Sequence, residues 1–225
     1  MKKILIGLVI AVAGAGLTTT ANAASTACGS VCVTLTPQAF GTGTVISVPP
    51  TGQIHAGEQV VTRQAGPSTF EDFLPYNYGT ALSVYFSRGL VTAAIASTWP
   101  KDPVIQLVFA PGGKSTNLCL GVATTTTENG TAVTLQPCNT PLRTMWVVML
   151  TSSGTYIPMI SGTDTSTTNP QVLTANEAAG PLDVNELDTF FANSVPSPIQ
   201  MWSSIYGPIR SYAILRQPPW LHSPA

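Results

Sequence analysis

The sequence has few charged residues. Asp, Glu, Lys and Arg together make up 8% of the 225 residues, against about a quarter in an average soluble domain. This scarcity excludes long helices with charged outer faces and charge-rich disordered tails. The 9 Lys and Arg are outnumbered by 10 Asp and Glu, which gives a formal net charge of −1. Because nothing here attracts a phosphate backbone, nucleic acid is excluded as a partner.

The sequence also lacks a hydrophobic run long enough to span a bilayer. The apolar stretch Ile4–Leu17 follows Lys2 and Lys3 and precedes Ala21-Asn22-Ala23, an order typical of an export signal. An uncleaved anchor is the alternative, but ~14 residues at ~1.5 Å each fall short of a ~30 Å hydrocarbon core. We therefore predict a signal peptide over residues 1–23. The mature protein, residues 24–225, is expected to be secreted, extracellular or periplasmic, without a membrane span.

Catalytic motifs are absent from the sequence. It has no Gly-x-Ser-x-Gly, no His-Glu-x-x-His and no P-loop, and its two histidines are His55 and His222. Acidic residues that cluster along the chain can in principle pair as acid and base of a hydrolase, but such residues more often lie on solvated faces. These clusters are Glu71-Asp72 and the group Asp183, Glu186 and Asp188. We predict no enzyme activity and no cofactor, with an unrecognised hydrolase as the remaining alternative.

The four cysteines are Cys28, Cys32, Cys119 and Cys138. An even set in an exported protein is typical of disulfides, and three connectivities are possible. Adjacency favours Cys28 with Cys32 and Cys119 with Cys138, the second closing a loop of about 19 residues worth ~3 kcal/mol in the chain-entropy model. A zinc site is the alternative, but the sequence has no Cys-x-x-Cys spacing, so we expect no metal.

Short segments of β-branched and aromatic residues recur along the chain, separated by Gly, Pro and Asn. This spacing suits hairpins and leaves no room for repeated βαβ units, so the predicted fold class is all-β. One short helix is predicted over Leu182–Phe191, an exposed loop over Thr163–Asn169, and paired strands within Ala81–Trp99. The predicted strands are Val31–Leu35, Gly43–Val48, Leu82–Phe86, Val104–Phe109, Ala132–Leu135 and Trp146–Leu150.

A glycine turn, an alternating strand and an aromatic residue recur three times. Two copies have the same sixteen-residue offset from glycine to aromatic, and the third has a longer loop. The copies run from Gly57 to Phe73, from Gly130 to Trp146, and from Gly180 to Gln200-Met201-Trp202. We interpret them as a pseudo-threefold β architecture in which no unit buries its face alone; coincidence among Thr-rich strands is the alternative.

The central copy resembles one repeat of the ricin B-type β-trefoil lectins. The matching segments are Leu118-Cys119-Leu120-Gly121-Val122, Asn129-Gly130-Thr131-Ala132-Val133-Thr134-Leu135, Cys138-Asn139 and Trp146. Gln200-Met201-Trp202 is in addition a literal Gln-x-Trp, so the similarity covers about thirty residues plus this tripeptide. The resemblance implies a β-trefoil with an intra-repeat Cys119–Cys138 disulfide and with Trp146, Gln200 and Trp202 as core residues of the repeats.

On this basis we expect a single β-trefoil-like domain over residues 24–225, with insertions or an N-terminal extension. The clearest repeat is placed at 103–150, the next at 151–205, and a weak N-terminal repeat at about 35–75.

The residues that hold sugar in that family are not retained here. The family uses an Asp, an aromatic and an Asn, whereas the central repeat has Gly121, Gln136 and Arg143, with Thr144 in place of the Gln of Gln-x-Trp. A glycine cannot accept sugar hydroxyls as a carboxylate does. In the last repeat, Thr174 and Ile199 stand at the corresponding positions. The resemblance therefore implies a lectin scaffold whose usual galactose sites are lost.

Aromatic residues indicate another place for a ligand. Tyr76-Asn77-Tyr78 is predicted to lie in a turn, where tyrosines offer stacking area and hydroxyls. We therefore predict a secreted, non-catalytic, lectin-like protein that binds carbohydrate or a glycoprotein through a diverged site. The alternative is a trefoil used for protein binding: a toxin delivery subunit similar to the lectin-like A and C subunits of cytolethal distending toxins, an inhibitor, or a structural module.

Overall fold

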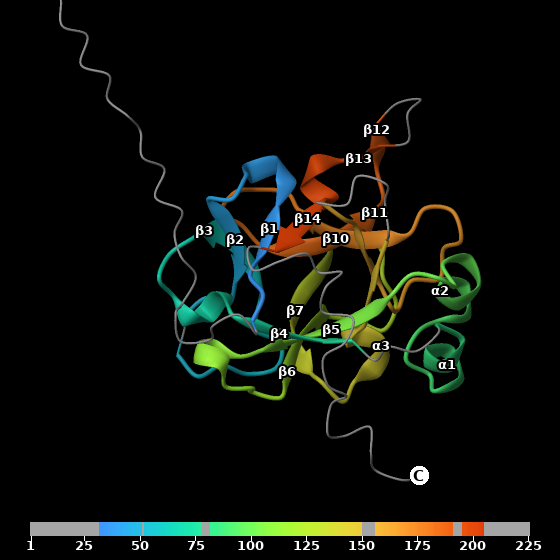
Figure 1. Cartoon of the computed structure of the whole chain (residues 1–225), viewed down its shortest axis with the longest axis horizontal. Helices are drawn as coiled ribbons and strands as arrows, with labels where there is room; N and C mark the ends of the chain where they lie inside the picture. Colours follow the sequence, from blue (N-terminus) through green and yellow to red (C-terminus); the bar gives the residue numbers. More distant parts are fainter. Residues whose placement is uncertain (1–31, 51, 78–81, 150–155, 191–194, 205–225) are drawn as a thin grey trace, which may run out of the picture.

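A computed structural model describes residues 32–50, 52–77, 82–149, 156–190 and 195–204 (Figure 1). Its strands are β1 Leu35–Pro37, β2 Thr44–Ser47, β3 Val61–Gln64, β4 Phe73–Asn77, β5 Val104–Phe109, β6 Leu118–Val122, β7 Thr131–Pro137, β8 Trp146–Val148, β9 Met159–Ser161, β10 Gln171–Ala175, β11 Leu182–Glu186, β12 Thr189–Phe190, β13 Val195–Pro196 and β14 Trp202–Ser204. Its α-helices are α1 Leu82–Ser87, α2 Ala93–Thr98 and α3 Pro141–Thr144, and its 3₁₀ turns are η2 Gln38–Phe40, η3 Thr69–Glu71, η4 Pro111–Gly113 and η5 Pro198–Gln200. The predicted segment 1–23, Cys28 and Tyr78 lie outside the described residues.

Six strands form a closed antiparallel barrel. Ladders join β1 to β14, β4 to β5, β5 to β8, and β8 to β9. Two isolated bridges complete the ring: Val33 pairs with Phe73, and Ile157 pairs with Trp202. Closure leaves these strands without a free edge in the barrel.

Three hairpins cap one end of the barrel: β2–β3, β6–β7 and β10–β11. Their second strands pair with one another in a triangle. At its centre, Nε2 of Gln59 donates to the carbonyl oxygens of Val133 at 3.0 Å, Leu182 at 3.1 Å and Val60 at 3.4 Å, three equivalent positions of the repeats. A six-stranded barrel with three capping hairpins is a β-trefoil, so the predicted fold class is confirmed.

The barrel interior holds one apolar cluster to which all three repeats contribute. Nε1 of Trp146 donates to the carbonyl of Leu120 at 3.0 Å, and Nε1 of Trp202 makes the same bond to Leu173 at 2.9 Å. In the first repeat, Phe73 takes the tryptophan position and is fully buried. Each tryptophan thus anchors the hairpin of its own repeat to the barrel.

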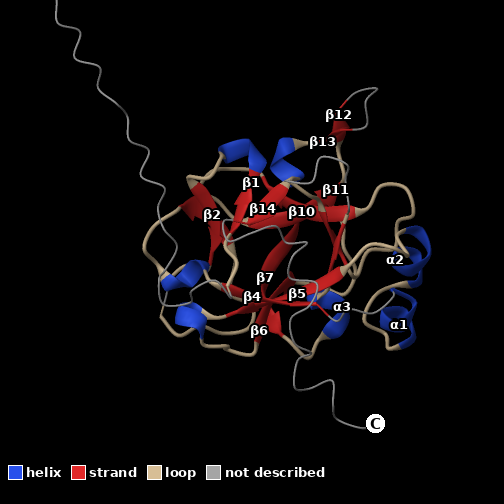
Figure 2. Cartoon of the chain, viewed as in Figure 1, coloured by secondary structure: helices blue, strands red, loops and turns tan. Residues whose placement is uncertain are grey.

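A helical insertion between β4 and β5 overturns the prediction of strands at Leu82–Phe86 and within Ala81–Trp99. In α1, Leu82 and Tyr85 are three residues apart, so both fall on one helix face, which is buried. The Thr92 side chain caps α2 by accepting from the backbone N of Ile95. Both helices lie beside the barrel (Figure 2). They pack on a second apolar cluster, separate from the interior one. Tertiary packing here outweighs the β-propensity of the segment.

Two further predictions were wrong. In the predicted helix Leu182–Phe191, residues 182–190 are not helical, because Leu182 and Val184 alternate with half-exposed polar residues and pair with β10 as the strand β11, followed by β12. Tyr76 and Asn77 do not lie in a turn but in β4, paired with β5. Thr163–Asn169 is a loop as predicted, yet Thr163 and Asp164 are buried in it. Among the described residues, no helix is long and apolar enough to cross a membrane.

Candidate functional site

The structure brings together the residues at the family's sugar positions in the second repeat, but it closes that site. A Cβ on Gly121 would lie 2.6 Å from the carbonyl oxygen of Arg143 and 3.1 Å from Cγ of Gln136. The guanidinium of Arg143 donates to the carbonyl oxygens of Val122, at 3.0 Å, and Ala123. The site therefore has no room for a side chain at position 121, and its arginine is bonded within the protein.

The third repeat uses Thr174, at one of the corresponding positions, and Gln200 for internal hydrogen bonds. Thr174 is 1% exposed, and its hydroxyl donates to the Val172 carbonyl at 2.9 Å. Gln200 donates through Nε2 to the Glu186 carbonyl at 2.8 Å and accepts at Oε1 from the backbone N of Asp188 at 2.7 Å. The Gln of Gln-x-Trp thus ties the turn before β14 to the end of β11, a structural role.

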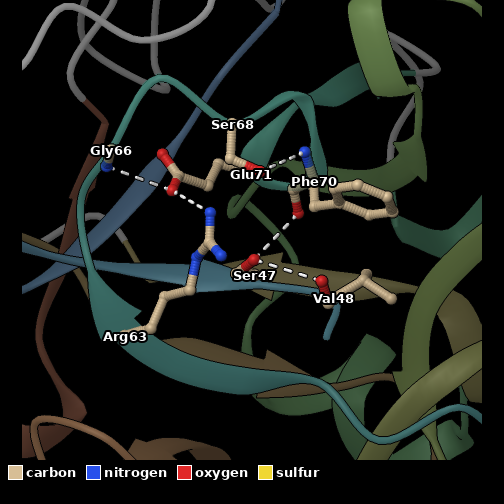
Figure 3. Close-up of polar contacts among 7 residues, drawn as sticks. All are labelled: Ser47, Val48, Arg63, Gly66, Ser68, Phe70 and Glu71. Carbon is tan, nitrogen blue, oxygen red and sulfur yellow. Dashed lines mark hydrogen bonds and ion pairs between the residues drawn. The ribbon is translucent and has the colours of Figure 1, made fainter. Parts of the chain in front are cut away.

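The first-repeat counterparts follow from strand register, which sequence reasoning alone did not provide. Ile46 pairs with Thr62 as Leu120 pairs with Leu135, which places Ser47 and Arg63 at the sugar positions. Figure 3 shows both engaged within the protein. Ser47 donates to the Phe70 carbonyl at 3.2 Å, and Arg63 forms a 2.7 Å ion pair with Glu71, whose side chain is 1% exposed. Burial raises the pKa of Glu71 above its ordinary value, although Arg63 and the Gly66 N–H act in the opposite direction.

The described part of the predicted tyrosine site lies in a strand and not in a turn. Tyr76 is half-buried against the small cluster of Val108 and the Cys119–Cys138 disulfide, whose Cα atoms are 5.1 Å apart. That disulfide is the one predicted for the central repeat. Cys32 is also disulfide-bonded. The contribution of the neighbouring Tyr78 remains a prediction because it lies outside the described residues.

A polar cavity of about 490 Å³ lies between the second and third repeats. Its walls come from the turn between β6 and β7, the loop between β9 and β10, and the facing ends of β10 and β11. All nine lining side chains carry a hydroxyl, an amide or a carboxylate: Thr127, Glu128, Asn129, Asp164, Thr165, Ser166, Asn169, Gln171 and Glu186. The volume falls in the range of small-molecule sites, about 300–1,000 Å³.

Two lining residues hold buried acceptor atoms without a donor. Asp164 is 3% exposed and Gln171 is 6% exposed. Oδ1 of Asp164 accepts from the Ser166 N–H at 3.3 Å, but Oδ2 of Asp164 and Oε1 of Gln171 have no partner in the described part of the chain. Burial raises the pKa of Asp164 and the charge of Glu186 adds to the rise, although the backbone N–H groups of Ser166, Gln171 and Thr165 act in the opposite direction. Each of these two residues therefore keeps one buried oxygen atom without a hydrogen-bond donor.

Two other carboxylates considered for catalysis, those of Asp72 and Asp183, are engaged in structural contacts, whereas Asp188 is exposed. Asp72 accepts from the Gly112 N–H at 3.1 Å. Asp183 accepts from Asn176 at 2.9 Å and from Asn185 at 2.8 Å, and burial raises its pKa. The imidazole Nε2 of His55 lies 3.3 Å from a Glu58 carboxylate oxygen. Among the described residues, no group of three or more His, Cys, Asp or Glu side chains is arranged to hold a metal ion.

Comparisons with known proteins bear on the fold. No protein-family model matches the sequence, and no curated protein matches it. The chain is similar to the designed threefold-symmetric protein ThreeFoil, with a TM-score of 0.53 and 11% identity over 77% of this chain and 96% of that one.

Two larger proteins share the fold over part of their length. An exo-β-1,3-galactanase from Clostridium thermocellum gives a TM-score of 0.52 at 15% identity, and a mosquitocidal holotoxin gives 0.51 at 9%. Each match covers 77% of this chain, but only 30% of the galactanase chain and 17% of the toxin chain. At such identities the likeness shows the fold alone: the chain has the architecture of a β-trefoil.

Proposed function

We propose that this protein is a secreted, non-catalytic carbohydrate-binding protein whose ligand lies in the polar cavity between the second and third repeats. The observation that carries this proposal is the cavity lining, in which every side chain is a hydrogen-bonding group. A sugar ring presents many hydroxyls, which act as both donors and acceptors. The buried acceptors of Asp164 and Gln171 would receive hydroxyl donors from such a ligand.

The family's usual positions do not support galactose binding in this chain. In the second repeat the backbone of Arg143 stands against Gly121, and in the third repeat Thr174 is buried and hydrogen-bonded. Secretion is supported by the Cys119–Cys138 disulfide, since such bonds persist in oxidising compartments.

The test is a broad glycan-array screen of the oxidised mature protein with free galactose as competitor. We expect binding that galactose does not displace. Thr165→Trp should fill the cavity from its exposed rim and abolish binding, whereas Thr167→Trp, in the same loop but outside the lining, should retain it. Silence across the array would overturn the proposal and favour the protein-binding alternative.

A further inference from the structure

A second cavity of about 320 Å³ adjoins the first. Its lining residues are Ala123, Thr124, Thr126, Thr127, Glu128, Thr131 and Ala132. Thr127 and Glu128 line both cavities, so the two spaces lie on either side of the same turn between β6 and β7. A ligand that fills both has to extend over this turn, which requires more than one sugar ring.

The charge of the lining residues has one sign. Glu128, Asp164 and Glu186 bring carboxylates to the cavities, and neither lining includes a Lys or Arg. Arg143 is the basic group beside the second cavity, but its guanidinium is bonded to the carbonyls of Val122 and Ala123. The resulting negative potential opposes anionic ligands and favours cationic ones.

The buried acceptors point independently to a donor-rich ligand. Oδ2 of Asp164 and Oε1 of Gln171 lack donors in the described chain, although their side chains are more than nine-tenths buried. An ammonium group carries three donors and no acceptor, and it therefore complements such a wall better than a carboxylate or an acetamido group. We infer that the two cavities together bind an oligosaccharide of basic amino sugars, of the glucosamine type. This inference rests on the proposed function and narrows it to one class of sugar.

The experiment compares three tetramers by calorimetry at about pH 6, above the ordinary pKa of a free carboxyl group. They are the glucosamine tetramer, the neutral N-acetylglucosamine tetramer and the anionic galacturonate tetramer. We expect the glucosamine tetramer to bind tightest, to weaken as salt is added, and to exceed glucosamine itself by at least about tenfold because it occupies both cavities.

Charge-removing variants test which carboxylates contribute to binding of the glucosamine tetramer. Glu128→Gln and Glu186→Gln each remove one exposed charge and should weaken glucosamine-tetramer binding by about twofold to fivefold, the range for exposed ion pairs. Binding of the neutral tetramer should not change. Glu177→Gln is the matched control, because Glu177 is an exposed carboxylate at the far turn between β10 and β11.

The outcomes separate the two proposals. Equal binding of the neutral and basic tetramers, or tighter binding of galacturonate, would overturn the amino-sugar inference and leave carbohydrate binding standing. Equal affinity for glucosamine and its tetramer would overturn the use of both cavities. An absence of binding to every sugar, here and on the array, would overturn both proposals.

Discussion

Nε2 of Gln171 donates a hydrogen bond to Oδ1 of Asn129 across 3.1 Å, which connects the third repeat to the turn of the second. The same oxygen accepts from the backbone N of Glu186 at 2.7 Å. One amide oxygen therefore fixes the positions of β10 and β11 relative to the turn between β6 and β7. Because these elements form the cavity walls, Asn129 determines the shape of the proposed site.

Replacing Asn129 should weaken both sugar binding and the fold. Asn129→Ala removes both hydrogen bonds at an exposed position, and we expect a loss of about 1–2 kcal/mol in unfolding free energy. Sugar binding should fall by about tenfold or more, since the turn is no longer held in place. Urea denaturation and the array measure the two effects, with the exposed Asn139→Ala as control. Unchanged binding would show that the turn does not shape the site.

Restoring the family's acidic residue at position 121 should not restore galactose binding. The side chain of Gly121→Asp would begin 2.6 Å from the Arg143 carbonyl oxygen and 3.1 Å from Cγ2 of Thr144. Overpacking of this kind costs about 1–3 kcal/mol, and the added carboxylate would face a carbonyl. We expect a lower melting temperature and no signal from a galactose column. Retention on galactose with wild-type stability would show that the site is open.

The burial of Glu71 should make stability depend on pH. Burial raises the pKa of Glu71 above 4.5, so the folded state holds this proton more tightly than the unfolded chain. The contribution of Glu71 to unfolding free energy is therefore greatest at acid pH, declines as pH rises through the unfolded value, and levels off above the folded pKa.

Glu71→Gln removes this contribution. The variant lacks the ionisable group. Its unfolding free energy should therefore rise relative to that of the wild type as pH increases from about 4 to 7. Urea titrations across this range measure the difference in unfolding free energy between the two proteins. The pKa values of Asp164 and Asp183 are also raised, but their contributions are common to both proteins and cancel. A difference that is constant with pH would contradict the assignment.

The sequence predicted the parts of the fold that depend on local pattern. The alternation around Val133 and the sixteen-residue spacing from Gly130 to Trp146 mark a hairpin and its barrel strand, and Gly130 has the positive φ of 83° that such a turn favours. The helices were missed because Leu82–Ser87 combines β-branched and aromatic residues, and only packing on the outside of the barrel makes it helical.

The proposed site could not be found in the same way. Asn129 and Gln171 are 42 positions apart in the chain, and each segment by itself has the polar composition of an ordinary turn or loop. Their proximity depends on how successive repeats meet, which no local pattern encodes. By contrast, the predicted family positions Gly121, Gln136 and Arg143 do come together, because one hairpin and the turn that follows it carry all three.

The equivalent bonds of Trp146 and Trp202 lead to a prediction about symmetry. Each indole is fully buried and donates to the carbonyl of one strand in its own hairpin, Leu120 or Leu173. Replacement by Phe leaves that carbonyl without its donor and a small void beside it, at a cost of about 2 kcal/mol.

Trp146→Phe and Trp202→Phe should therefore lower the unfolding free energy by similar amounts, although only the second repeat carries the Cys119–Cys138 disulfide. The losses should match because both rings pack in one interior cluster, so removal of either bond weakens the same cooperative unit. Chemical denaturation followed by circular dichroism measures both variants. A loss confined to Trp202→Phe would mean that the disulfide holds the second repeat independently of its tryptophan, and the three repeats would then not unfold as one barrel.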